Sequence, residues 1–123
     1  MSLEKKKVRN KLRWACLERD NRTCRVCDRR VGAVDEEGNR ITLAMLDAHH
    51  ITPRTNLPNQ GNVIDNVITL CPPCHEYAEA FLNGDREHEP PTKRGWHAYA
   101  PSALYALIGS SYEKAKAASE AAS

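Results

Sequence analysis

Two pairs of cysteines constrain the fold of this chain more than any other feature. Cys24 and Cys27 form the pair in TCRVC, and Cys71 and Cys74 form the pair in LCPPC. Two residues between the cysteines of a pair let both thiolates reach one ion, and two such pairs complete a tetrahedral zinc site of the structural type. The sequence therefore predicts a structural Zn²⁺ that joins two segments lying far apart in the chain.

Length and cysteine usage favour a metal site over disulfides. The chain has 123 residues with one Phe and 28% charged residues, which leaves room for a single domain with a thin apolar core. No apolar run is long enough to span a membrane, and no apolar segment of the signal-peptide type follows the charged N-terminus. We therefore expect a cytoplasmic protein without a membrane partner, in which thiols bind metal rather than form a disulfide framework.

The spacing between the two cysteine pairs departs from that of an ordinary zinc ribbon. Forty-three residues, 28–70, separate the pairs, where about 15–20 are usual. Within this insertion, ITLAMLDAHHI at 41–51 and DNVITLC at 65–71 are rich in β-branched and apolar residues, which favours one or two short strands in the first and a strand in the second. The intervening PRTNLPNQGNV is rich in Pro, Asn and Gly and predicts a loop.

Two helices are predicted beside these strands. Residues 4–19 place apolar side chains at helical spacing with basic residues between them, and Asp20 ends the pattern. In CPPCHEYAEAFLNG the two prolines suit the first turn of a helix, and Asn83 and Gly84 supply its stop. The expected order of the central part is thus strand, loop, strand, helix.

The C-terminal part is predicted to be an extended arm followed by one helix. Residues 85–101 are charged and contain proline, whereas SALYALIGSSYEKAKA, residues 102–117, places apolar side chains on one helical face. The predicted organisation is a core with its N-terminal helix, residues 1–84, and an arm and helix, residues 85–123, that pack on or next to this core.

The charge of the chain is unevenly distributed. The first 30 residues carry eleven Lys and Arg against four acidic residues, a net charge of +7, so the other 93 residues have a net charge of −5. Such a basic segment is either a solvated helix face or a contact surface for nucleic-acid phosphate, and charge alone does not decide between them.

Two adjacent histidines, His49 and His50, occur in DAHHITP at the expected end of a strand. Adjacent side chains of a strand point to opposite faces, so the two histidines are suited to different tasks. One can turn towards a metal shared with the following helix, while the other faces a substrate and moves protons. An isolated histidine is more often packed and hydrogen-bonded, but these two are not isolated.

The segments CRVC, DAHHITP and DNVITLCPPCH together resemble an HNH endonuclease, a nuclease of the ββα-metal type, with a four-cysteine zinc site. The resemblance covers about residues 14–83. It implies an α+β fold, a small zinc-stapled ββα-metal core with flanking N- and C-terminal helices. It also implies His50 as the general base, Asn66 as the brace of the loop between the strands, and a catalytic divalent cation held by His49 and His75.

The implied reaction is hydrolysis of a DNA phosphodiester, by nicking or cleaving, with 5′-phosphate and 3′-hydroxyl products. Many relatives have Asp where this chain has His49, so the cation would be held by two imidazoles. Imidazole suits Mn²⁺, Co²⁺ and Ni²⁺ better than Mg²⁺, and Mn²⁺ is therefore the expected cofactor. The nearby Asp47 is expected to be a solvated or structural carboxylate rather than a ligand.

DNA is the implied partner of this chain. Arg54 follows HHITP directly, and the expected helix supplies further phosphate contacts from Lys5, Lys6, Lys7, Arg9 and Arg13. The chain also resembles small phage-encoded HNH proteins, some associated with genome packaging, which by analogy adds packaging proteins as partners, the host cytoplasm as location and a monomer as the expected state. The alternative function is a non-catalytic zinc-ribbon module that binds nucleic acid, with the histidines as structural or spare zinc ligands; an interaction adaptor is a third.

Overall fold

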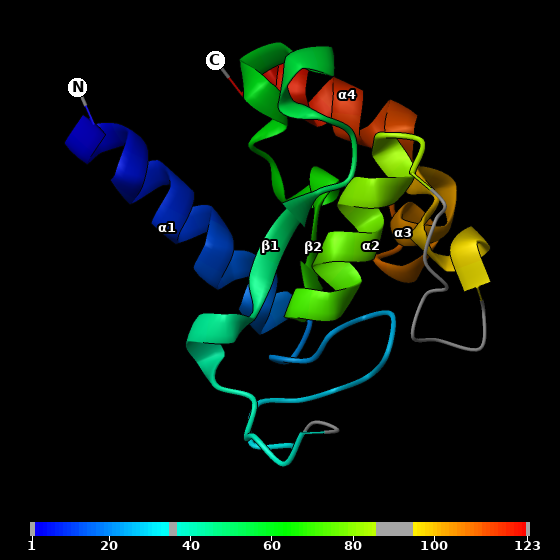
Figure 1. Cartoon of the computed structure of the whole chain (residues 1–123). Helices are drawn as coiled ribbons and strands as arrows, with labels where there is room; N and C mark the ends of the chain where they lie inside the picture. Colours follow the sequence, from blue (N-terminus) through cyan, green and yellow to red (C-terminus); the bar gives the residue numbers. More distant parts are fainter. Residues whose placement is uncertain (1, 35–36, 86–94, 123) are drawn as a thin grey trace.

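The computed structural model describes residues 2–34, 37–85 and 95–122, with side chains described from Asn10 onward. Four helices and two strands of these residues form the α+β fold that the sequence predicts (Figure 1). None of the helices has the length and apolar character needed to cross a membrane. The elements are α1 (Ser2–Arg19), β1 (Asp47–His50), β2 (Val67–Leu70), α2 (Pro72–Leu82), α3 (Pro101–Leu107) and α4 (Tyr112–Ala121).

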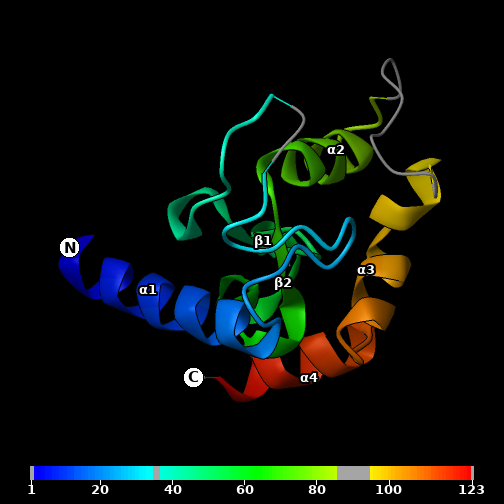
Figure 2. The ribbon, with the colours of Figure 1, turned by 90° about the horizontal axis from the view of Figure 1, so that it is seen from below.

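The two strands form an antiparallel pair at the centre of the structure. His49 lies opposite Ile68, and His50 lies opposite Val67. All four residues of β2 are buried, because the pair is covered on both sides: Figure 2 shows it between α1 and α2, and both helices contact both strands. Of the first expected strand segment, only residues 47–50 are strand, since residues 43–45 form a 3-10 turn.

Helix α2 begins and ends where the sequence predicts. Cys71 is its N-cap and has an extended backbone, as expected for a residue that precedes a proline. Pro72 and Pro73 occupy the first turn, where missing backbone N–H groups cost nothing. The helix ends at Leu82, and Gly84 takes a left-handed φ of +78° just beyond it. Helix α2 therefore follows β2 with no intervening loop.

Helix α1 is fixed to the strands at its C-terminal end, while its N-terminal half extends away from the body (Figures 1 and 2). Asp20 is buried and accepts from the backbone N of Thr69 at 2.9 Å and from Nη2 of Arg19 at 2.7 Å. The same guanidinium donates to the carbonyl oxygens of Ile64 and Val67. Cys16, the odd cysteine, is fully buried, and this burial raises its pKa to about 12. It is a core residue.

The predicted single C-terminal helix is wrong, because the chain forms two helices there. Gly109 has a φ of +66°, which ends α3, and the Ser111 hydroxyl then accepts from the backbone N of Lys114 and caps α4. The apolar spacing continues through this turn and hid it. Helix α4 packs against the 3-10 turns Pro58–Gly61 and Ile64–Asn66 in the loop between the strands (Figure 1).

The expected extended arm is corrected in part. Residues 95–99 form a 3-10 turn, and residues 86–94 lie outside the described residues. Tyr99 in this turn is buried, and its ring lies 5.8 Å from that of Tyr77 on α2. The turn joins one apolar core shared by the helices and strands, whose largest members include Leu17, Leu46, Ile51, Ile68, Leu70, Tyr99 and Leu104.

Candidate metal centres and active site

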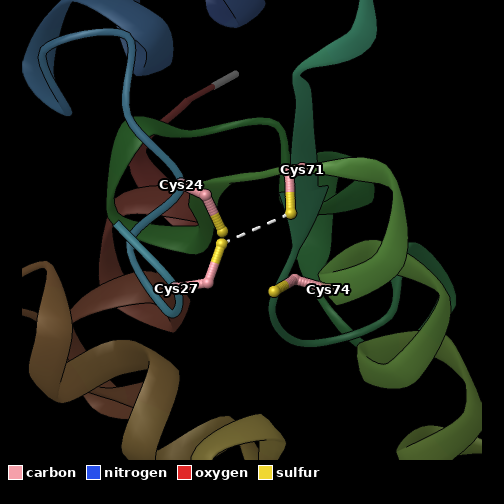
Figure 3. A group of neighbouring side chains, drawn as sticks. All are labelled: Cys24, Cys27, Cys71 and Cys74. Carbon is pink, nitrogen blue, oxygen red and sulfur yellow. Dashed lines mark hydrogen bonds between the residues drawn. The ribbon is translucent and has the colours of Figure 1, made fainter. Parts of the chain in front are cut away.

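The four cysteines of the two pairs come together at one point of the structure (Figure 3). Their Sγ atoms all lie within 4.8 Å of one another, and those of Cys27 and Cys71 are 3.5 Å apart. A tetrahedral zinc ion with Zn–S bonds of about 2.3 Å needs sulfur atoms about 3.8 Å apart. Cys24 and Cys74 are fully buried, and none of the four forms a disulfide. The cluster fits a structural zinc ion.

Backbone hydrogen bonds hold the first cysteine pair against the strands. Asp28 takes a left-handed φ of +65° and donates its backbone N to the carbonyl of Cys24, which closes the turn. Arg25 donates its backbone N to the carbonyl of Thr69 on β2. The second pair needs no such link, because Cys71 and Cys74 flank the first turn of α2.

The thiols of the cluster influence one another strongly. Hydrogen bonds from the other thiols, that of Cys27 first, lower the pKa of Cys24, whereas the interaction with Cys24 raises the pKa of Cys74. Four thiolates at this separation repel one another, so a cation is required to keep all four deprotonated.

A second group of metal-binding side chains lies between β1 and α2. His49 comes from β1, and His75 and Glu79 come from successive turns of α2. Oε1 of Glu79 lies 3.5 Å from Nδ1 of His49 and 3.3 Å from Nε2 of His75. Spacing of i and i+4 puts His75 and Glu79 on one helix face. Two imidazoles and one carboxylate therefore offer three ligands to one ion.

His49 shows most clearly that this group suits a cation. Its side chain is 2% exposed, and neither ring nitrogen has a hydrogen-bond partner among the described residues, the 3.5 Å contact with Glu79 being too poor in geometry. Burial, and then the rings of His75 and His50, lower the pKa of His49 to about 3, so its ring is neutral. A buried nitrogen with a lone pair and no partner is costly, and a bound ion removes that cost.

Sequence reasoning missed Glu79. The only available signal is its i+4 spacing from His75, and an exposed glutamate on a helix is too common to stand out. Asp47 is half-exposed, and its Oδ2 lies 3.3 Å from Nδ1 of His75. A carboxylate at the second nitrogen orients a ligating imidazole, so Asp47 has the structural position expected for it rather than a place among the three ligands.

His50 and Asn66 occupy the two ends of the loop between the strands. Nε2 of His50 lies 2.8 Å from Oδ1 of Asn62. Asn66 is fully buried: its amide donates to the carbonyls of Thr52 and Gly61 and accepts from Thr52 N and from the hydroxyl of Tyr105. These bonds use the whole hydrogen-bonding capacity of the amide. Asn66 therefore holds the loop and has no surface to offer a substrate.

A cavity of about 460 Å³ brings the histidines together with Arg54. His49 and His50 both border it, although adjacent strand residues are expected to face apart, because the cavity lies where β1 ends. Arg54 also borders the cavity, and its Nη2 donates to Oε1 of Gln60. The remaining lining comes from Ala48, Pro53, His75, Glu79, Leu82 and Asn83. Metal ligands, a histidine and a cation thus share one opening.

The basic residues of α1 are less uniform than the sequence predicts. Arg13 is half-buried, and its Nη2 donates to the carbonyls of Leu43 and Leu46, so this guanidinium holds a turn rather than standing ready for DNA. The side chains of Lys5, Lys6, Lys7 and Arg9 lie outside the described part of the chain.

Gly61 provides a test of the loop that Asn66 braces. Its φ is +61°, and a Cβ here would lie 2.6 Å from Nδ2 of Asn66. We expect Gly61→Ala to lower the unfolding free energy by roughly 1–2 kcal/mol through left-handed strain and by roughly 1–3 kcal/mol more through lost bonds of Asn66. Gly109→Ala is the control, with φ +66° and nothing within 4 Å. Equal losses in thermal unfolding would show that Asn66 is not tightly held.

Comparison with known proteins gives one match. The family model described as HNH endonuclease matches residues 24–80, from the first cysteine of the zinc cluster to the residue after Glu79. No curated protein and no solved structure matches the chain. The matched residues include both candidate metal centres, both strands and most of α2. This part of the chain, residues 24–80, is an HNH endonuclease domain, and its family is one of nucleases.

Proposed function

We propose that the protein is a metal-dependent DNA endonuclease that hydrolyses phosphodiester bonds, with His50 as the general base. The observation that supports this most is the convergence of His49, His75 and Glu79 beside His50 in one cavity. A cation bound by these three side chains would contact phosphate oxygen and neutralise the charge that grows on the departing 3′ oxygen. A structural zinc site alone gives no reason for this second group.

The protein's own side chains have separate tasks in this reaction. Neutral His50 takes a proton from water as the water oxygen bonds to phosphorus and the bond to the 3′ oxygen breaks. Arg54, at the rim of the same cavity, donates to a non-bridging phosphate oxygen. Asn66 keeps the loop between the strands in place. The products carry a 5′-phosphate and a 3′-hydroxyl.

DNA binding is proposed to involve α1 as well as Arg54. The N-terminal half of α1 extends from the body, and its sequence contains Lys5, Lys6, Lys7 and Arg9. Contacts of this kind with phosphate bind DNA without reading its sequence and weaken as salt rises. Arg13 is left out of this surface, because it is engaged with the turn at residues 43–45.

Plasmid nicking followed by ligation tests the proposed function. Supercoiled plasmid incubated with the protein and Mn²⁺ should become open circles, and DNA ligase alone should reseal them, because the ends are a 5′-phosphate and a 3′-hydroxyl. A zinc-ribbon module without catalytic activity would bind the plasmid and leave it supercoiled. Open circles that ligase seals only after phosphatase and kinase treatment would contradict the proposed chemistry.

Glu79 changes the expected metal preference. With a carboxylate beside the two imidazoles, we expect Mn²⁺ to support the fastest nicking, with Co²⁺ and Ni²⁺ near it, and Mg²⁺ to support slower but measurable nicking, since Mg²⁺ prefers oxygen ligands. Glu79→Gln should weaken cation binding by more than the roughly 10–100-fold that follows loss of an outer partner. Nicking with Mg²⁺ should fall further than nicking with Mn²⁺.

The control for Glu79→Gln is Glu76→Gln, which removes the same charge from an exposed position of the same helix. Nicking rates of both variants are measured against the concentration of each chloride salt, on protein that keeps its structural zinc. If Glu76→Gln and Glu79→Gln change the Mg²⁺ and Mn²⁺ curves alike, Glu79 acts through general charge and is not a ligand.

A further inference from the structure

We propose that Asn62 is a positioning residue that holds His50 in the tautomer with its proton on Nε2, which leaves Nδ1 as the nitrogen that accepts the proton from water. The catalytic consequence rests on the proposed function, whereas the tautomer itself does not. Nothing in the spacing of the HNH-like segments singles out Asn62. It lies in the part of the chain that the sequence predicts only as a loop.

The contact between the two side chains defines the tautomer. Nε2 of His50 lies 2.8 Å from Oδ1 of Asn62. An amide oxygen only accepts hydrogen bonds, so Nε2 of His50 must donate, and a neutral imidazole has a single N–H group. Nδ1 therefore carries a lone pair. A base needs that lone pair, and a ring free to exchange tautomers would offer it at this atom only part of the time.

An unusual backbone delivers Asn62 to this place. The three residues before it, Asn59, Gln60 and Gly61, all have left-handed φ values, of 53°, 60° and 61°. For the two residues with side chains, this conformation is strained, and such strain persists only where neighbouring groups enforce it. The backbone N of Asn62 donates to the carbonyl of Asn59 and so closes the turn.

Groups from distant parts of the chain enforce this turn. Nδ2 of Asn66 donates to the carbonyl of Gly61 at 3.1 Å, and Nδ2 of Asn59 donates to the carbonyl of Ser119 on α4 at 2.6 Å. The hydroxyl of Tyr105 on α3 in turn donates to Oδ1 of Asn66 at 2.7 Å. Helices α3 and α4 lie beyond the HNH match, which ends at residue 80. They therefore fix the loop that presents Asn62 to His50.

The proton transfer is simple in this arrangement. One O–H bond of water breaks and its proton goes to Nδ1 of His50, while the water oxygen bonds to phosphorus and the 3′ oxygen leaves with the electron pair of its bond. The proton on Nε2 stays shared with Oδ1 of Asn62 throughout, because a neutral amide oxygen is too weak a base to take it. Asn62 thus fixes the ring without entering the proton balance.

Nitrogen-15 NMR of the histidine rings tests the tautomer directly. The spectra are recorded above neutral pH on zinc-loaded protein with Mg²⁺, since Mn²⁺ would broaden the signals, and the signals of His50 are assigned by their loss in His50→Gln. We expect a protonated Nε2 and an unprotonated Nδ1 in the wild type. In Asn62→Leu, which has a similar shape but no acceptor, we expect a mixture of tautomers.

Nicking kinetics test the catalytic consequence. Asn62→Leu should lower kcat by about 10–100-fold, as loss of a group behind a catalytic side chain does, with KM, zinc content and melting temperature close to those of the wild type. Asn62→Asp keeps an acceptor oxygen and should restore most of kcat. Asn56→Leu, an exposed position on the same loop, is the control and should nick like the wild type.

The outcomes separate this inference from the proposed function. A proton on Nδ1 of wild-type His50 overturns the role of Asn62, whether or not the protein nicks DNA. Wild-type kcat in Asn62→Leu also overturns it, while the role of His50 as base is then still tested by His50→Ala. A protonated Nε2 in wild type together with mixed tautomers in Asn62→Leu supports the positioning role even if the wild type fails to nick.

Discussion

His50→Ala is expected to reduce plasmid nicking by about 10²–10⁴-fold, the contribution of a positioned general base, while DNA affinity and content of both metals stay near wild type. His50 is outside the group of three ligands formed by His49, His75 and Glu79, so its removal takes away proton transfer and leaves coordination intact. Single-turnover nicking and metal analysis of the same preparation measure both quantities. His97→Ala, an exposed histidine on the turn at residues 95–99, is the control.

The neighbouring histidine should behave in the opposite way. His49→Ala and His75→Ala are expected to lose the second cation and keep the zinc ion, because each supplies one of three ligands to that cation only. If His50→Ala loses the second cation while His49→Ala retains it, the two adjacent histidines have exchanged roles and the assignment of the general base is wrong.

Cys71→Ser is expected to unfold the domain rather than to remove activity alone. Cys71 joins the start of α2 to the cysteine turn after α1 through the zinc cluster. Structural zinc contributes on the order of 10–16 kcal/mol in small zinc-dependent folds, which equals or exceeds the stability of a typical domain, about 5–15 kcal/mol. Far-ultraviolet circular dichroism, thermal melting and zinc content should therefore all change together.

Cys16→Ser is the matched control for Cys71→Ser. Cys16 is also fully buried, but its sulfur lies near Thr69 and Asp20 and not in the cluster of four. It should keep its zinc and melt only modestly below the wild type. A zinc-free Cys71→Ser protein that melts like the wild type would contradict a structural role for the metal.

Several parts of this fold could be predicted because the signal is local. The two CxxC pairs define their metal site by spacing, and prolines at the start and Asn83 and Gly84 at the end define α2. The division of the last helix could not be predicted from periodicity, since Leu104, Ile108, Tyr112 and Ala115 keep helical spacing through the turn. The left-handed φ of Gly109 decides the matter.

The site was harder to predict where residues act through distant partners. Glu79 is an exposed residue of α2 until β1 brings His49 beside it. Asn62 is one of several asparagines in a loop, and its place depends on bonds from Asn66 and from Ser119, 57 positions further along the chain than Asn62. Charge alone could not tell that Arg13 supports a turn, because a basic residue on a helix reads the same in either role.

Two metal centres with separate tasks lead to one direct measurement. Protein treated with a chelator until it holds a single zinc ion per chain is incubated with supercoiled plasmid, first without and then with added Mn²⁺. We expect no nicking without Mn²⁺, open circles with it, and an unchanged zinc content in both cases. Equal nicking without any second cation, or intact DNA binding with no nicking at any Mn²⁺ concentration, would contradict a catalytic cation held by His49, His75 and Glu79.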